Sequence, residues 1–236
     1  MSSYEAYQPV TPAINAPETD RAAFVAKVYQ HVALALVAFV AFEAVLFVTG
    51  IAEAMREFFF GTGGFAWLAL LGGVMIIQNF AAKAALNLTD PGAQYMGLFG
   101  SAFGQALIFA PFLSFVFATD GAGPVVEAAI VTGVGFAFLT AIGLFTRKDL
   151  SFLRPLVMWG FGLALVAIIG ATILNFQLGV WFSLAMIAVS GASILFQTQN
   201  VVKRYPIGSH VAAAIGVFSS LMTMFWYGLR LFISRD

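Results

Sequence analysis

Seven long apolar stretches, separated by short polar segments, constrain this 236-residue chain more than any other feature. A hydrocarbon core of about 30 Å needs roughly 20 helical residues to cross it. Only 9% of the residues are charged, against about 25% in a soluble domain. The sequence therefore predicts an all-α, polytopic membrane protein whose seven transmembrane helices contact membrane lipid. The predicted spans are Val28–Gly50, Phe65–Ala82, Tyr95–Ala118, Pro124–Phe145, Pro155–Leu174, Leu178–Gln199 and Val211–Ile233.

The residues before the first span have a different composition. Met1–Asp20 contains three prolines and no basic residue, so it lacks the positively charged start of a signal peptide. It also has too few apolar residues to offset the entropy cost of ordering. We therefore expect residues 1–23 to form a disordered tail and residues 24–236 to form the seven-helix membrane domain.

The distribution of basic residues predicts the orientation of the chain, because Lys and Arg accumulate in cytoplasmic loops. With a cytoplasmic N-terminus, eight basic residues face the cytoplasm and three face the outside, where seven crossings also place the C-terminus. The eight are Arg21, Lys27, Lys83, Arg147, Lys148, Arg154, Lys203 and Arg204, and the three are Arg56, Arg230 and Arg235. This bias predicts a protein of the cell inner (plasma) membrane, or of an organelle membrane with similar topology.

The sequence offers little for catalysis or for a cofactor. It has no cysteine and only two histidines, His31 and His210, which excludes thiolate chemistry and a multi-histidine metal centre. Gly191–Ile194 lacks the last glycine of a GxSG protease motif, and there is neither an HExxH motif nor a pair of aspartates in the spans. A net charge of zero offers no attraction for nucleic acid. We predict a protein that is not an enzyme and binds no metal, cofactor or nucleic acid, with an intramembrane enzyme as a further alternative.

Small and polar residues inside the spans indicate how the helices pack. Gly100 and Gly104 form a GxxxG step, which favours packing within the chain, with a dimer face as the alternative. An ionisable residue at membrane depth is a functional candidate, and Glu43 lies in the outer half of the first span. Glu43 either pairs with Arg230 or extends separately from it to the outer interface. Gln105, at mid-membrane, either bonds to a neighbouring helix or lines a polar pore.

Several strings of the sequence are similar to those of one membrane-protein family. They are FVAKVYQHVALAL (Phe24–Leu36), GLFGSAFGQALIFAPFL (Gly97–Leu113), TRKDLSFL (Thr146–Leu153), GASILFQTQNVV (Gly191–Val202) and the final SRD (Ser234–Asp236). In this order and spacing they resemble the Bax inhibitor-1 (transmembrane Bax inhibitor motif) family. The resemblance implies a fold in which six helices surround a central seventh. It also implies an activity, since many members behave as pH-sensitive calcium leak channels.

The family's pH sensor is a pair of aspartates, one at the end of span six and one midway along span seven. Gln197, within Phe196–Gln199, stands at the first position, and Ser220 is the best match for the second. Neither an amide nor a hydroxyl titrates between pH 5 and 8. The resemblance therefore implies that a proton-switched gate built on this pair cannot operate in this chain.

The missing aspartates and the SRD ending are similar to the bacterial YccA-like branch of the family. Members of that branch associate with the FtsH-type membrane ATP-dependent protease, modulate it, and can be its substrates through a cytoplasmic N-terminal tail. The leading prediction is therefore a non-enzymatic partner of such a protease. The alternative is a calcium or other cation leak channel without the di-aspartyl sensor, in which Glu43, Gln105 and Gln197 line an ungated path.

Overall fold

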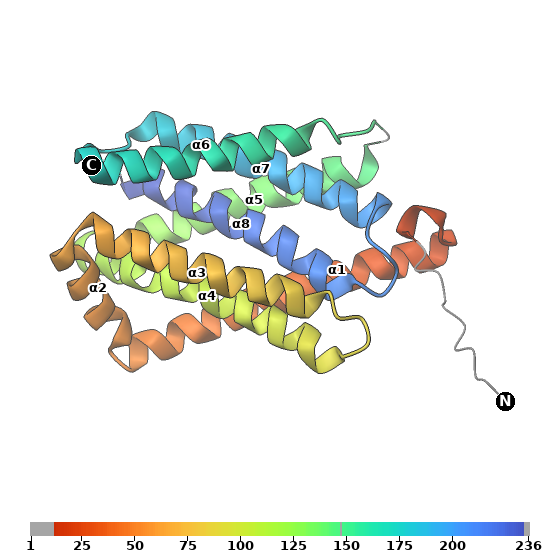
Figure 1. Ribbon diagram of the computed structural model, residues 1–236, viewed down its shortest axis with the longest axis horizontal. Coiled ribbons are helices and arrows are strands. Elements are labelled where there is room, and N and C mark those ends of the chain that lie inside the picture. Colours follow the sequence, from red (N-terminus) through yellow and green to blue (C-terminus); the bar gives the residue numbers. More distant parts are fainter. Residues whose placement is uncertain (1–11, 147, 234–236) are drawn as a thin grey trace.

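The computed structural model describes residues 12–146 and 148–233. Seven of their α-helices are long and apolar enough to cross a membrane, which confirms the prediction of an all-α, seven-span protein (Figure 1). The elements in order are η1 (Ala13–Asn15, a 3-10 turn), α1 (Glu18–Val48), α2 (Ile51–Thr62), α3 (Gly64–Ala85), α4 (Pro91–Thr119), α5 (Gly123–Phe145), α6 (Leu153–Leu174), α7 (Val180–Lys203) and α8 (His210–Ile233).

The short helix α2 was not predicted from the sequence. It is bounded by Gly50 and Gly63, whose φ angles of +76° and +91° suit glycine and let the chain turn sharply at both ends. Met55 packs against the core, whereas Arg56 forms a 3.2 Å ion pair with the exposed Glu53. Twelve residues extend only about 18 Å, so this amphipathic helix suits the membrane interface rather than a crossing.

Helices α4 and α8 form the centre of the bundle. Helix α8 packs against α1, α3, α4, α5 and α7, and in Figure 1 it lies between α6–α7 and α3–α4. In the most apolar 18-residue stretch of each helix, 56% of the residues are buried in α8 and 50% in α4, against 11% in α3 and in α6. Phe109 of α4 stacks on Phe225 of α8 with ring centroids 5.4 Å apart. Because α4 is nearly as enclosed as α8, the arrangement of six helices around one stays a prediction.

Glycines bring the backbones of α3 and α4 into contact. A Cβ added to Gly97 would collide with the carbonyl oxygen of Ala81 and lie 2.9 Å from the nitrogen of Ala85. At Gly104 the added atom would lie 3.3–3.5 Å from side chains of α3, whereas at Gly100 the nearest atom is 3.9 Å away. The glycine face of α4 therefore serves packing within the chain, as small residues do where lipid supplies no hydrophobic drive between helices.

The structure differs from the sequence prediction between residues 12 and 23. The backbone N–H of the fully buried Ala13 donates to the carbonyl of Tyr205 at 2.9 Å, and Pro12 forms an isolated β-bridge with Pro206. Burial of the Tyr205 side chain raises the pKa of its phenol. The disordered tail predicted for residues 1–23 is thus corrected from Pro12 onwards, because a partner distant in sequence orders it. Residues 1–11 lie outside the described part.

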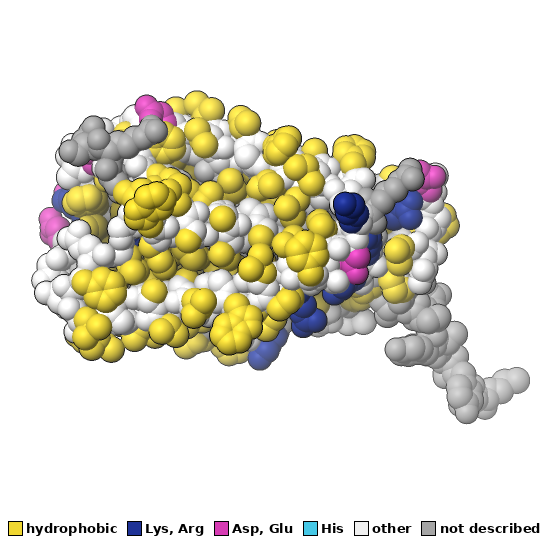
Figure 2. Space-filling model, turned by 90° about the horizontal axis from the view of Figure 1, so that it is seen from above, with side chains coloured by type: hydrophobic (Ala, Val, Ile, Leu, Met, Phe, Trp, Pro, Cys, Tyr) yellow, Lys and Arg dark blue, Asp and Glu magenta, His cyan; other side chains and the backbone are white. Residues whose placement is uncertain are grey.

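Apolar side chains cover most of the face shown in Figure 2, and most of the Lys and Arg side chains on that face lie towards the end at which α1 begins. We call this the basic end. We assign a basic residue to this end from the helix end or loop in which it lies. The described members are Arg21, Lys27, Lys83, Lys148, Arg154, Lys203 and Arg204. Arg56 and Arg230 lie at the opposite end, whereas Arg147 and Arg235 are outside the described residues.

Candidate functional site

The two positions matched to the family's sensor pair lie at the interface of α7 and α8. The side-chain amide of Gln197 lies against Gly216, where an added Cβ would come within 3.2 Å of it. Ser220, one turn further along α8, donates to the Gly216 carbonyl at 3.0 Å. Its Oγ lies 2.8 Å from the Oγ of Ser193, one turn before Gln197 on α7. The antiparallel helices therefore bring the two positions to neighbouring levels of one interface.

This interface is held together by neutral groups. Ser193 and Ser220 are both buried, and the hydroxyl of each finds a partner within the protein. Hydrogen bonds between hydroxyls carry no charge that protonation could change between pH 5 and 8. The arrangement can fasten α7 to α8, as interhelical hydroxyl bonds do in membranes.

The residue after Gln197 fastens α7 to two further helices. Thr198 is fully buried, and its hydroxyl shares a 3.0 Å hydrogen bond with the phenol of Tyr29 on α1. On α5, a Cβ added to Gly143 would come within 2.8 Å of the Thr198 side chain. From the sequence alone, Gln197 and the polar residues that follow it were placed at the end of a span, but no partners were assigned to them. The run of polar residues from Gln197 was the available signal.

Gln199 anchors the loop between α5 and α6. Its side-chain oxygen accepts from the backbone N–H of Leu150, and its amide nitrogen donates to the carbonyl of Lys148, both at 2.6 Å. In the same loop, the hydroxyl and the N–H of Ser151 donate to Asp149 at 2.9 and 3.0 Å. These bonds lower the pKa of the Asp149 carboxyl. The end of α7 thus organises the basic end of the molecule.

The two histidines meet at the same end. The rings of His31 on α1 and His210 on α8 have centroids 4.6 Å apart, and His31 Nε2 lies 3.1 Å from the hydroxyl of Tyr95 on α4. Within the described residues, no group of three His, Cys, Asp or Glu side chains could hold a metal ion. These contacts join α1, α4 and α8.

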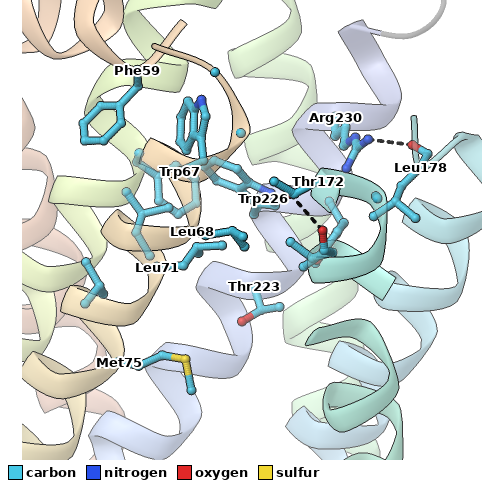
Figure 3. A pocket seen from close by; sticks show the side chains of 18 of the residues that line it. Phe59, Trp67, Leu68, Leu71, Met75, Thr172, Leu178, Thr223, Trp226 and Arg230 are labelled. Atoms are coloured by element: carbon cyan, nitrogen blue, oxygen red, sulfur yellow. Dashed lines mark hydrogen bonds between the residues drawn. The ribbon is translucent and has the colours of Figure 1, made fainter. Parts of the chain in front are cut away.

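A cavity of about 1090 Å³ lies between α3, α4, α6 and α8 (Figure 3). It extends from Arg230 and Leu178, at the end opposite the basic end, to Gln78 and Gln105 in the interior. Aromatic and aliphatic side chains form most of the wall, including Phe59, Trp67, Leu68, Leu71, Met75 and Trp226. The rings of Trp67 and Trp226 have centroids 6.5 Å apart.

Two of the predicted site residues, Gln105 and Arg230, line this cavity. The guanidinium of Arg230 donates to the carbonyl of Leu178 at 2.6 Å, which fixes it near the cavity's outer end (Figure 3). Among the described residues that line the cavity, Arg230 is the one that carries a charge. The site is therefore a mostly apolar space with one cationic side chain, which is hydrogen-bonded within the protein, at its outer end.

The structure does not bring Glu43 to Arg230. Glu43 is only 7% exposed, and neither of its carboxylate oxygens has a hydrogen-bond partner among the described residues. It lies one turn from each of two aromatic contacts between α1 and α4, Phe39–Phe109 and Phe47–Phe117. The predicted ion pair is therefore not formed, and Glu43 does not reach the interface either. Burial without a partner makes a charge on this carboxyl costly.

A comparison with protein families decides where the chain belongs. A family model described as "Inhibitor of apoptosis-promoting Bax1" matches residues 21–236. This chain belongs to the Bax inhibitor-1 family. The match covers nearly all of α1 and the whole of the other spans, so the resemblance seen in the sequence is confirmed. No curated protein matches the chain. It is a Bax inhibitor-1 protein whose α7–α8 interface is fastened by the neutral residues Gln197, Ser193 and Ser220.

Proposed function

We propose that this protein is a non-enzymatic partner of an FtsH-type membrane ATP-dependent protease, which it modulates and of which it can be a substrate. The neutral α7–α8 interface carries this proposal. Gln197 packs on Gly216, and Ser193 bonds to Ser220, where channel-forming members would carry two carboxylates. The bundle is retained while the proton switch is lost, which supports the YccA-like branch and its role as a protease partner.

The proposal places the protein in the inner (plasma) membrane with the basic end in the cytoplasm, following the positive-inside bias. The N-terminal segment then emerges on the cytoplasmic side, and the C-terminus lies outside. A reporter that is active only in the cytoplasm should be active after Pro206 and silent after Asp236. Activity of the reporter after Asp236 would contradict the orientation.

The anchored N-terminus defines how much chain such a protease can reach without disturbing the bundle. The contact of Ala13 with Tyr205 leaves 12 residues before it, and Pro12 is itself paired with Pro206. The remaining 11 residues would extend at most about 36–40 Å, against about 65–70 Å for 20 unanchored residues. A protease that pulls on the chain would therefore meet the Ala13–Tyr205 contact before it reached α1.

Deletion of residues 1–11 tests the proposal, because it spares the contacts of Pro12 and Ala13. In cells that contain the protease, we expect the shortened protein to have a longer half-life. It should still co-purify with the protease in mild detergent, because the spans are retained. As the matched control, a Gly/Ser segment of the same length in place of residues 1–11 should restore turnover if chain length is what the protease needs. Unchanged half-life, with no protease recovered with either form, would refute the proposal.

A cation leak channel is the second candidate, and the cavity that reaches Gln78 and Gln105 favours it. Calcium prefers several oxygen ligands, often carboxylates, and the described lining residues include no Asp or Glu. Calcium flux in proteoliposomes distinguishes the two functions. A channel through this cavity predicts flux that Gln105→Leu reduces, whereas the partner function predicts no flux above that of protein-free liposomes.

A further inference from the structure

The cavity between α3, α4, α6 and α8 begins at two exposed loops. Its lining at the outer end, opposite the basic end, includes Gly63 between α2 and α3, and Asn175 and Gln177 between α6 and α7. All three residues are exposed. Loops that connect membrane-spanning helices lie where those helices leave the hydrocarbon core. The mouth of the cavity can therefore be reached from the aqueous phase.

The inner end of the cavity carries polar side chains from three helices. They are Gln78 and Asn79 on α3, Gln105 on α4 and Thr223 on α8 (Figure 3). Asn79 follows Gly64, the first residue of α3, by 15 residues, or about 22 Å of helix. Gln105 precedes the last residue of α4 by 14 residues, or about 21 Å. Since a hydrocarbon core is about 30 Å thick, these polar groups lie deep within it.

The amide of Gln105 indicates what fills this space. An amide has two N–H donors and a carbonyl acceptor, yet neither Gln105 nor Asn79 forms a side-chain hydrogen bond with another described residue. Gln78, in contrast, donates to the Ser101 carbonyl at 3.0 Å and accepts from the Ser101 hydroxyl at 2.7 Å. An amide without a partner in hydrocarbon is costly. Acyl chains would leave Gln105 in that state, whereas water in a polar cavity forms about three hydrogen bonds with such groups.

The cavity is closed towards the basic end. Beyond Gln78, the backbones of α3 and α4 touch, because an added Cβ on Gly97 would collide with Ala81 and lie 2.9 Å from the nitrogen of Ala85. The lining includes no described residue of α3 after Asn79 and none of α4 before Gln105. Water can therefore enter from the outer end alone.

We propose that this cavity is a water-filled vestibule, open at the end opposite the basic end and closed beneath Gln105. Its water forms hydrogen bonds with the amides of Gln105 and Asn79 and hydrates the interior of the bundle from one side. This inference is independent of whether the protein is a protease partner. A leak channel would need a further passage past Gly97, so hydration without flux supports the vestibule and contradicts the channel.

The sequence contains no cysteine, so hydration can be measured with single-cysteine variants of the full chain. Gln105→Cys and Thr223→Cys, in sealed membrane vesicles, are treated with a methanethiosulfonate reagent whose fixed positive charge prevents it from crossing the membrane. The thiolate is the form that reacts, and apolar surroundings suppress it. Thiols that remain are then counted with a fluorescent maleimide after the protein is denatured. The rate of reaction therefore reports whether water reaches each position.

Two lipid-facing positions at nearly the same depth are the matched controls. Ile76→Cys lies two residues before Gln78 on α3, and Phe103→Cys lies two residues before Gln105 on α4. Both native side chains are exposed, but neither lines the cavity. We expect the cavity cysteines to react at least about tenfold faster than these controls, because a thiol pKa raised by about one unit lowers the thiolate fraction about tenfold.

Cysteines in two loops identify the side from which the reagent enters. Asp120→Cys, between α4 and α5, marks the end with the mouth, and Thr89→Cys, between α3 and α4, marks the basic end. Gln105→Cys should react with reagent on the side that labels Asp120→Cys, and not on the side that labels Thr89→Cys. Thr223→Cys exchanges a small polar side chain for another, so it yields a result even if Gln105→Cys folds poorly.

Two results would overturn the proposal. One is that the cavity cysteines react no faster than Ile76→Cys and Phe103→Cys, which would mean that acyl chains or repacked side chains exclude water from the cavity. The other is equal reaction of Gln105→Cys from both sides of the membrane. The inner end would then be open, and the cavity would be part of a continuous passage rather than a vestibule.

Discussion

The hydroxyl oxygens of Ser193 and Ser220 lie 2.8 Å apart across the interface of α7 and α8. Ser220 also donates to the carbonyl of Gly216, so its single proton is used and Ser193 is the donor to Ser220. Resemblance to the family places an aspartate at the position of Ser220. In this chain, a pH response at that position would have to be introduced by substitution.

Ser220→Asp should introduce such a response. An ionised carboxylate buried without a partner costs about 3–5 kcal/mol, whereas the protonated acid is far cheaper to bury and can still donate a hydrogen bond. We expect the loss in thermal stability, measured by circular dichroism in detergent, to be larger at pH 8 than at pH 5. Ser220→Asn is the neutral control and should change stability equally at both values. An equal loss for Ser220→Asp at pH 5 and pH 8 would contradict the prediction.

Gly97→Ala and Gly100→Ala should differ although they lie one turn apart on α4. The added methyl group at Gly97 overlaps the backbone of α3 at Ala81 and Ala85, whereas at Gly100 the nearest atom is 3.9 Å away. We expect Gly97→Ala to lower the free energy of unfolding by about 1–3 kcal/mol. Gly100→Ala should be neutral or stabilising by up to about 1 kcal/mol. Denaturant titration measures both, and similar values for the two variants would show that this glycine face is not a close contact.

Gln199→Ala should loosen the loop between α5 and α6. It leaves the N–H of Leu150 and the carbonyl of Lys148 without their side-chain partner, at a cost of about 1–3 kcal/mol. Limited trypsin digestion in detergent should therefore cut faster after Lys148. Gln30→Ala, at an exposed position of α1, is the control and should leave the cleavage rate unchanged. The prediction fails if the two variants are cut at the same rate.

Glu43→Leu should raise stability, because both carboxylate oxygens are buried without a partner among the described residues. Removal of such a group should contribute about 1–3 kcal/mol. Since the structure separates Glu43 from Arg230, the effects of Glu43→Leu and Arg230→Gln should add within about 0.5 kcal/mol. Thermal or denaturant unfolding of the two single variants and the double variant provides the cycle. A larger coupling energy would mean that the two side chains interact.

The spans were predictable because each is a long apolar run, and the third and last runs end within one residue of α4 and α8. Helix α2 was not predicted, because its 12 residues are fewer than a membrane crossing needs. Its signals were nevertheless in the sequence. Gly50 and Gly63 bound it, and Glu53 and Arg56 have the spacing of neighbours on a helix.

The contacts of the candidate site were predictable only in part. Resemblance to the family pointed to Gln197 and Ser220, but that they share one interface depends on how α7 pairs with α8. The contact of Ala13 with Tyr205 joins segments at opposite ends of the chain, and no local pattern indicates it. The cavity likewise depends on the separation of α3 from α6, which hydropathy does not encode.

Of the seven spans, α8 is the last to leave the ribosome, yet it and α4 are the most deeply buried. Its partners α1, α3, α4, α5 and α7 are all inserted before it. The hairpin of α3 and α4 can close early, since Gly97 meets Ala81 and Ala85 across a short loop. The faces that α8 covers, in contrast, stay uncovered during most of translation. The helix α8 therefore packs against five helices that have all been synthesised before it, and the centre of the bundle can close only after α8 has joined them.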